Sequence, residues 1–223
     1  MNLSISHLLS AALFSRTAGA IESANAGRAF GDFWENIQAN AIAAVLTSVA
    51  ALEAYANELF VDHAEVFPQL RLDIMAKLWE LYEQKPILEK YDFALLLRQG
   101  NAFDRGASPY QDIAALIRLR NALTHYKRNA LTHYKPEWSN EQVEHAKVSH
   151  ALKNRAKVSH ALKNRAVASS FFPVTDSLFL RAWASHGTTR WAVRSVVSFV
   201  LDFEQRASLK SRIAPFVERL NAL

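Results

Sequence analysis

Apolar side chains recur every three or four residues along most of this chain, which is the period of an α-helix with one buried face. The longest such stretch runs from about Asp32 to His63. A shorter stretch follows Ser4, a good helix-capping residue, and runs to about Ser23. The buried stripe of the longest stretch consists of Phe33, Ile37, Ile42, Val45, Val49, Leu52, Tyr55 and Leu59. The pattern therefore predicts two long helices at the start of the chain.

Proline and glycine divide the rest of the chain into shorter helical stretches, because proline cannot continue a helix and glycine often ends one. We expect helices from Pro68 to about Tyr82, from Leu88 to Arg98, after Pro109, after Ser139, from Thr188 to about Arg206, and around Pro215. The sequence shows no long alternation of apolar and polar residues of the kind typical of β-strands, and no clear domain boundary. The sequence predicts a single all-α domain over residues 1–223, built as an antiparallel helical bundle.

Two segments occur twice without a gap. Arg120–Lys127 returns unchanged as Arg128–Lys135, and Ala146–Arg155 returns as Ala156–Arg165. The repeats lie on either side of a turn at Pro136. If both are helical, they extend the two arms of one helical hairpin by about 12 Å and 15 Å. The alternative is that the extra copies bulge out as tolerated surface insertions without function. Their identity indicates a recent or engineered event.

The net charge of +5 depends on these duplications. Removing one copy of each repeat lowers the count of Lys and Arg from 26 to 21, equal to the 21 acidic residues. Bulk charge is therefore weak support for a nucleic-acid partner. The cations between Lys147 and Arg165 could grip RNA phosphates, although such a run is more often a solvated helix face.

The chain contains no cysteine, which excludes disulfides, thiolate metal sites and a cysteine nucleophile. Its most apolar stretch, Ala39–Leu52, is interrupted by polar residues and is too short to cross a bilayer. The first twenty residues lack a basic leader, so a signal peptide is not expected. We predict a cytoplasmic protein without a membrane span.

Each copy of the eight-residue repeat places asparagine directly after arginine, and histidine five residues after that arginine. A guanidinium holds phosphate oxygens in a fork, and an imidazole that titrates near neutrality can accept and return a proton. These groups suit chemistry on a phosphodiester. The candidate catalytic residues are Arg120, Asn121 and His125 in the first copy and Arg128, Asn129 and His133 in the second.

The R-N-x-x-x-H pattern from Arg120 to His125, followed by Tyr-Lys and later Pro-Glu-Trp, resembles the HEPN superfamily of helical proteins. The segment Leu46–Phe60, which contains Glu53, resembles the long helix that packs beside the motif helix in that family. The tail His186–Ala192 resembles members with an extended C-terminal part. The similarity covers residues 30–205 approximately.

The resemblance implies a helical bundle that forms a homodimer and cleaves RNA without a metal or cofactor, as a toxin-like or defence-related ribonuclease. His125 would take the proton from a ribose 2′-hydroxyl, and Arg120 would stabilise charge on the phosphate. Asn121 would orient the imidazole or donate to phosphate, and Glu53 could orient Arg120. On a helix the arginine and histidine project about 140° apart, so an unwound end or a second chain must complete the site.

The second copy offers Arg128, Asn129 and His133 in the same roles. The first copy is favoured because it continues the apolar stripe Ile113–Leu119, which fixes its rotation. The family also pairs with antitoxins or nucleotidyltransferase-type partners, and such a partner is an expectation here. Regulation by tyrosine modification is not expected, because Tyr126 and Tyr134 follow the histidines directly instead of standing two residues after them.

Other interpretations stay open. The chain could be a catalytically inactive module of the same fold that binds a protein or a nucleotide, or a structural bundle without a ligand. Arg120 and His125 then form a surface ion pair and a helix cap, and Glu53 serves as a structural partner of a buried arginine. No metal site is expected from His145, His150 and His160, because their spacing spreads them around a helix.

Overall fold

The computed structural model describes residues 2–124, 158–171 and 183–223, and every regular element in these ranges is helical. The elements are α1 (Leu3–Ala24), α2 (Phe33–Val61), α3 (His63–Val66), α4 (Leu72–Tyr82), α5 (Ile87–Leu97), α6 (Tyr110–Thr124), α9 (His186–Arg206), the 3₁₀ helix η3 (Ala214–Phe216) and α10 (Val217–Asn221). The prediction of an all-α bundle is confirmed.

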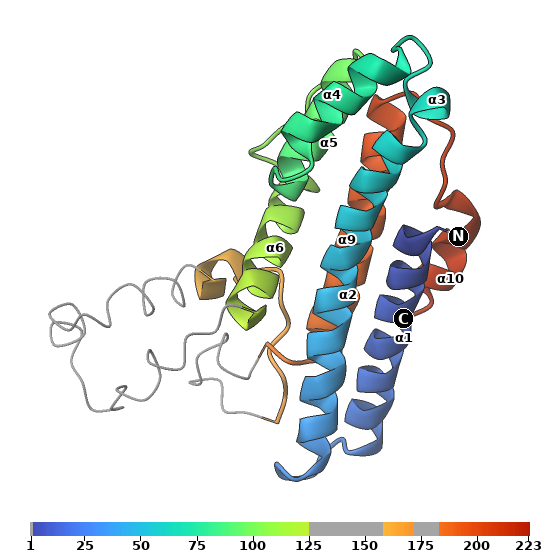
Figure 1. The fold of residues 1–223 in the computed structure, drawn as a ribbon. Helices are drawn as coiled ribbons and strands as arrows, with labels where there is room; N and C mark the ends of the chain where they lie inside the picture. The colour runs from blue at the N-terminus through green and yellow to red at the C-terminus, as the bar shows by residue number, and fades with distance from the viewer. Residues whose placement is uncertain (1, 125–157, 172–182) are drawn as a thin grey trace, which may run out of the picture.

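Helices α1, α2 and α9 run side by side along the length of the molecule (Figure 1). α1 and α2 form a tight antiparallel hairpin. The fully buried positions of α1 are mostly alanine, including Ala11, Ala12 and Ala18. Because alanine projects little beyond the backbone, α1 can approach its neighbours closely. The long helix predicted from about Asp32 to His63 is confirmed as α2, with Asp32 as its N-terminal flanking residue.

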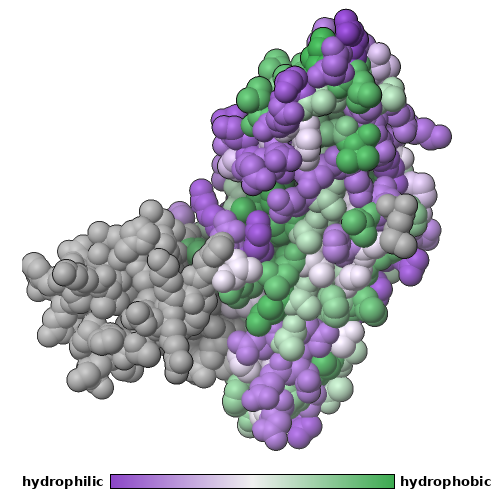
Figure 2. Space-filling view, in the orientation of Figure 1, coloured by the Kyte–Doolittle hydropathy of each residue, from purple (hydrophilic) through white to green (hydrophobic). Residues whose placement is uncertain are grey.

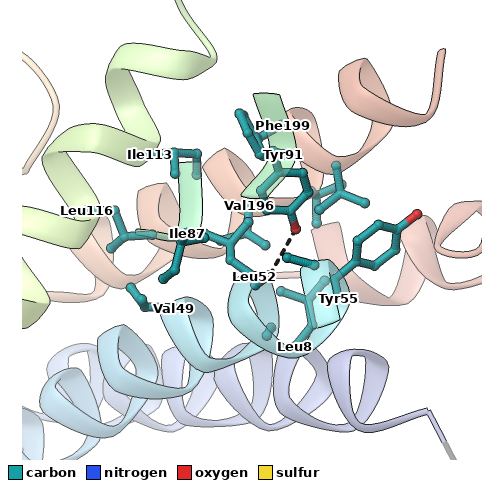
Figure 3. Close-up of a cluster of buried hydrophobic side chains, with 14 of the residues drawn as sticks. Leu8, Val49, Leu52, Tyr55, Ile87, Tyr91, Ile113, Leu116, Val196 and Phe199 are labelled. Carbon is teal, nitrogen blue, oxygen red and sulfur yellow. Dashed lines mark hydrogen bonds between the residues drawn. The ribbon is translucent and has the colours of Figure 1, made fainter. Parts of the chain in front are cut away.

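Helix α6 packs across α2 and α9 and runs antiparallel to both (Figure 1). Side chains from α1, α2, α5, α6 and α9 meet in the core (Figure 3). Tyr91 is fully buried and donates its hydroxyl hydrogen to the Leu52 carbonyl oxygen, at 3.0 Å. The apolar residues labelled around this bond include Val49, Leu52, Ile87, Ile113, Leu116, Val196 and Phe199. This hydrogen bond ties α5 to α2, and Ile113 and Leu116 of α6 pack into the same core.

Helix α2 is long and apolar enough, by length and composition, to cross a membrane. This helix extends well beyond Ala39–Leu52, the apolar stretch that the sequence pattern indicated. Thirteen α2 residues are buried in the bundle, which accounts for much of this apolar character. Figure 2 shows apolar and weakly polar side chains along the middle of the visible face, with polar ones towards its ends. The cytoplasmic location stays a prediction.

Two helix starts differ from the predictions. Asn2, not Ser4, caps α1, because the Asn2 side chain accepts a hydrogen bond from the Ile5 amide. Ser4 is buried and donates from its amide and its hydroxyl to Glu58 of α2. Pro68 lies in a turn, and α4 starts at Leu72. A side chain that can cap a helix was here used for a contact between helices.

Helix α5 was predicted to end at Arg98, and it ends at Leu97, shortly before Gly100. A Cβ atom at Gly100 would lie 2.6 Å from the carbonyl oxygen of Arg206, at the end of α9. The backbone of α9 therefore occupies the space that any other residue would need. Gly100 lets the chain leave α5 against α9 and turn towards α6.

The described structure contains the start of the eight-residue repeat and the end of the ten-residue repeat. The first copy of the eight-residue repeat continues α6 as far as Thr124. From the second copy of the ten-residue repeat, residues 158–162 are helical. The predicted turn at Pro136, the helix after Ser139 and the extended hairpin lie outside the described residues.

Candidate functional site

The first copy of the motif starts on the last two turns of α6. Ile113, Leu116 and Leu119 are fully buried, so they define the inward face of this helix. Each residue advances about 100° around the helix. Arg120 is therefore at the edge of the buried face and is half-buried, while Asn121 points outward and is exposed. The first copy thus has the rotation that the apolar stripe predicts.

Arg120 has an incomplete set of partners. Its Nε atom is buried and has no hydrogen-bond acceptor among the described residues. The only acid on α6, Asp112, is already paired with Arg165, with 2.6 Å between Asp112 Oδ1 and Arg165 Nε. Among the described residues, no ion pair is formed by Arg120 or by its exposed neighbour Arg118. The end of α6 therefore presents guanidinium groups whose charge no described carboxylate neutralises.

The position of these arginines also has an explanation within the fold. The C-terminal end of a helix carries a partial negative charge, which favours nearby cations. Thr124 donates its hydroxyl hydrogen to the Arg120 carbonyl oxygen at 3.1 Å, so one helix-end carbonyl already has a side-chain partner. The dipole accounts for the presence of positive charge here. It does not supply the acceptor that Nε lacks.

Glu53, the predicted orienting residue, makes no hydrogen bond or ion pair with Arg120. Leu116 of α6 and Val49 of α2 lie close together (Figure 3). Arg120 is one turn beyond Leu116, and Glu53 is one turn beyond Val49 in the opposite direction because the helices are antiparallel. At 1.5 Å per residue the two positions are offset by about 12 Å along the axis. No direct contact between Glu53 and Arg120 supports an orienting role for Glu53.

Glu53 lies near a different cation, Lys90 of α5, which is only 2% exposed. The Lys90 ammonium donates to the Asn57 Oδ1 atom at 2.9 Å and lies 5.4 Å from the centre of the Trp79 ring. Burial lowers the pKa of Lys90 from its ordinary value, and the negative charges of Glu53 and Glu83 partly oppose that shift. Glu53 is exposed, and its charge acts on Lys90.

Sequence reasoning missed Lys90. Its helix, Ile87–Leu97, is apolar on most sides, and a single lysine in such a stretch is usually read as a solvent-exposed position. The available signal was the pair Glu53 and Asn57, which are four residues apart and so share one face of α2. That pair indicates a cation opposite α2 but does not say which one.

A second polar cluster joins α1 to the start of α9. His186 Nδ1 lies 2.9 Å from the Ser15 carbonyl oxygen, so this nitrogen carries the proton, and the His186 amide donates to Glu22 Oε1 at 2.8 Å. A Cβ at Gly19 would lie 2.8 Å from the imidazole ring, so the ring requires glycine there. The tail that contains His186 therefore fastens α9 to α1.

Burial raises the pKa of Glu22, while the hydrogen bond from the His186 amide acts against this shift. Beside them, the Ser15 and Thr189 hydroxyl groups lie 2.8 Å apart in the buried contact between the two helices. These hydrogen bonds hold α1 and α9 together.

The remaining candidate residues, His125, Arg128, Asn129 and His133, lie outside the described residues. Of the predicted basic run, Lys163 is exposed, whereas Arg165 is tied to Asp112. Within residues 2–124, 158–171 and 183–223, no three His, Asp or Glu side chains gather to hold a metal ion. His160 is exposed, and His145 and His150 fall outside these ranges.

Comparison of the chain with protein-family models, with curated proteins and with solved structures found no match. The HEPN resemblance therefore rests on the motif residues of the sequence alone and stays a prediction.

Proposed function

We propose that this protein is a metal-independent endoribonuclease of the HEPN type, with a toxin-like or defence-related role. Its active form is a homodimer in which an arginine and a histidine from two chains share one cleft. The substrate is RNA because the reaction uses the ribose 2′-hydroxyl, which DNA lacks.

In the proposed reaction, His125 accepts the proton of the 2′-hydroxyl, and the 2′-oxygen attacks the adjacent phosphorus. The bond from phosphorus to the 5′-oxygen breaks, and that oxygen takes up a proton to leave as a 5′-hydroxyl. The other product is a 2′,3′-cyclic phosphate. Arg120 stabilises the charge that gathers on the phosphate oxygens, and this kind of stabilisation is commonly the largest contribution to such a rate enhancement.

The observation that carries this proposal is the incomplete pairing of Arg120. A buried guanidinium nitrogen without an acceptor is costly, and a phosphate oxygen is the acceptor that a guanidinium binds best. Asn121 is exposed beside Arg120. These features support an anion site at the end of α6.

The first motif copy is the favoured one, because its first five residues are part of α6. The second copy, with Arg128, Asn129 and His133, remains the alternative. An inactive module of the same fold is the other candidate function, and it would use Arg120 to bind a phosphate-bearing ligand without cleaving it.

RNA cleavage in EDTA separates these cases. Wild type, the Arg120→Ala/His125→Ala variant and the Arg128→Ala/His133→Ala variant are compared on one RNA, with the product ends identified. We expect cyclic phosphate ends from wild type, loss of cleavage in the first variant and retention in the second. The reverse pattern assigns the site to the second copy. Equal cleavage by all three, or none by wild type, would contradict the proposal.

Light scattering tests the dimer. Wild type that cleaves RNA as a monomer at assay concentration would contradict the shared cleft. Wild type that binds RNA through Arg120 without cleaving it would favour the inactive module.

A further inference from the structure

The second copy of the ten-residue repeat occupies a defined place against the bundle. Val158, Ala161 and Leu162 are 5%, 7% and 0% exposed. Beyond them Arg165 forms an ion pair with Asp112 of α6, at 2.6 Å, and also donates to the Ala161 carbonyl oxygen. We call this place the repeat seat: the site on the bundle that buries these three apolar side chains and pairs Asp112 with an arginine.

The short helix in the repeat seat, residues 158–162, ends at Asn164 and the two residues that follow it. Asn164 has a φ of 69°, a left-handed conformation that asparagine tolerates better than most residues. The amides of Arg165 and Ala166 both donate to the Leu162 carbonyl oxygen, at 2.9 Å. The burial, the ion pair and the helix end thus all come from residues between Val158 and Ala166.

The first copy contains every side chain that the repeat seat uses. The counterparts of the five residues, ten positions earlier, are Val148, Ala151, Leu152, Asn154 and Arg155. Alanine follows both copies, as Ala156 and Ala166. The contacts available to the two copies within the seat are therefore chemically the same. Any preference between them must come from the chain that connects them to the rest of the fold.

The connection after the seat favours the second copy. Val167 stands two residues after Arg165, and its carbonyl oxygen accepts hydrogen bonds from the Ser185 and Thr188 side chains at the start of α9. Its side chain also lies against Gly187, where an added Cβ would be 2.5 Å away. With the second copy seated, the chain passes directly from the seat to this anchor.

With the first copy seated, ten residues would have to leave the seat and return to the Val167 anchor. The preceding connection would become ten residues shorter, but closure entropy changes little with the length of a long loop. Closing the new ten-residue loop disfavours this arrangement by on the order of 10- to 100-fold. The second copy therefore holds the seat, as the structure shows.

We propose that the two copies compete for one seat and that the first copy replaces the second whenever the second is damaged. The duplication then provides a spare anchor for the segment that joins α6 to α9. This inference does not depend on the ribonuclease proposal.

Substitution of the central leucine tests the replacement. Urea unfolding is compared for wild type, Leu162→Asp, Leu152→Asp and the variant with both changes. We expect less than a twofold change in the unfolding constant for Leu152→Asp. Leu162→Asp should increase it by about 10- to 100-fold, the preference for the second copy. The variant with both changes should lose at least roughly 1000-fold, because no copy can then bury leucine.

A deletion gives the matched control. In a chain that lacks Ala146–Arg155, Leu162→Asp alone should be as damaging as both changes together, since the spare copy is gone. The proposal is wrong if Leu162→Asp in the full chain already equals the double variant. It is equally wrong if Leu162→Asp has no effect, because the seat would then not contribute to stability.

Cross-linking decides the question even where the double variant does not fold. The chain has no cysteine of its own, so Asp112→Cys can be paired with either Arg165→Cys or Arg155→Cys and treated with a short thiol-specific cross-linker. Positions 112 and 165 should cross-link in the parent chain. In the Leu162→Asp background, cross-linking should shift to positions 112 and 155. Failure of this shift in folded protein would overturn the proposal.

Discussion

Two cations lie beside α2, and the fold treats them differently. Lys90 is almost completely buried, yet it has an amide acceptor on Asn57, an aromatic ring beside it and carboxylates nearby. Arg120 is only half-buried, yet its Nε atom has no acceptor in the part of the chain that the structure describes. Burial alone would identify Lys90 as the unusual group. The completeness of its partners indicates instead that Lys90 is structural.

This comparison separates two reasons for a cation inside a fold. A buried charge that its own chain satisfies strengthens a helix contact and has no capacity left for a ligand. A guanidinium with a missing acceptor keeps such capacity, because the desolvation cost is already present before the ligand arrives. The anion site is therefore expected at Arg120 rather than at Lys90.

The largest expected effect follows from removing the acceptor of Lys90. Asn57→Leu leaves the ammonium without its hydrogen-bond partner and should lower the free energy of unfolding by about 2–3 kcal/mol. Urea unfolding at pH 7 measures the loss.

Asn40→Leu is the matched control for this substitution. Asn40 also lies on α2, but it donates only to the Asn36 carbonyl oxygen of its own helix. We expect a change below about 0.5 kcal/mol there. Equal losses at both positions would mean that the Lys90 contact contributes nothing specific.

Replacing Arg120 should change RNA cleavage strongly and the free energy of unfolding only slightly. Arg120→Met keeps an apolar stem but removes the unpaired guanidinium, so the free energy of unfolding should change by less than about 1 kcal/mol. RNA cleavage should fall at least about 100-fold, because charge stabilisation at the phosphate is lost.

Arg118→Met provides the control on the same helix, since Arg118 is exposed and stands outside the motif. It should affect neither property strongly. If Arg120→Met costs several kcal/mol and leaves cleavage intact, Arg120 is structural and the comparison with Lys90 fails.

The pH dependence of stability should distinguish Lys90 by its sign. Its pKa in the folded protein is lowered from the ordinary 10.5, so at intermediate pH the unfolded chain binds more protons than the folded one. The contribution of Lys90 to the free energy of unfolding should therefore rise with pH up to about 10.5, and it is lost as pH falls through the lowered pKa. Wild type minus Lys90→Met, measured by urea unfolding from pH 8 to 10, should show this rise. A flat difference would contradict the assigned burial effect.

The sequence was sufficient for features that depend on spacing along the chain. The stripe of α2 and the rotation of α6 follow from apolar residues three or four positions apart, and burial of Ile113, Leu116 and Leu119 confirms that rotation. Such a stripe must face the core whichever helix covers it. The orientation of Arg120 could therefore be derived before any tertiary contact was known.

Partners that come from distant segments could not be derived in this way. Glu53 was assigned to an arginine because an acid in an apolar stripe needs a cation, but the nearby cation comes from α5. Ser4 was predicted to cap α1 and instead bonds to Glu58, 54 residues away. Glu53 is exposed and does not need a buried cation. Ser4 was correctly read as a hydrogen-bonding residue, and the packing of helices decided its partner.

The smallest expected effect concerns Glu53, and it tests how far the two cation sites are independent. Glu53→Gln removes one of the two negative charges that hold up the pKa of Lys90, so that pKa should fall further, as seen in the pH profile of unfolding. The free energy of unfolding at pH 7 should change by only a few tenths of a kcal/mol, because Glu53 is exposed. RNA cleavage should change less than twofold, since about 12 Å of helix separates Glu53 from Arg120. Glu83→Gln should behave in the same way, because Glu83 acts on the same lysine. A loss of cleavage in Glu53→Gln but not in Glu83→Gln would show that Glu53 belongs to the arginine site. The two acids have the same effect on Lys90, so such a difference would require the Glu53 carboxylate to reach Arg120.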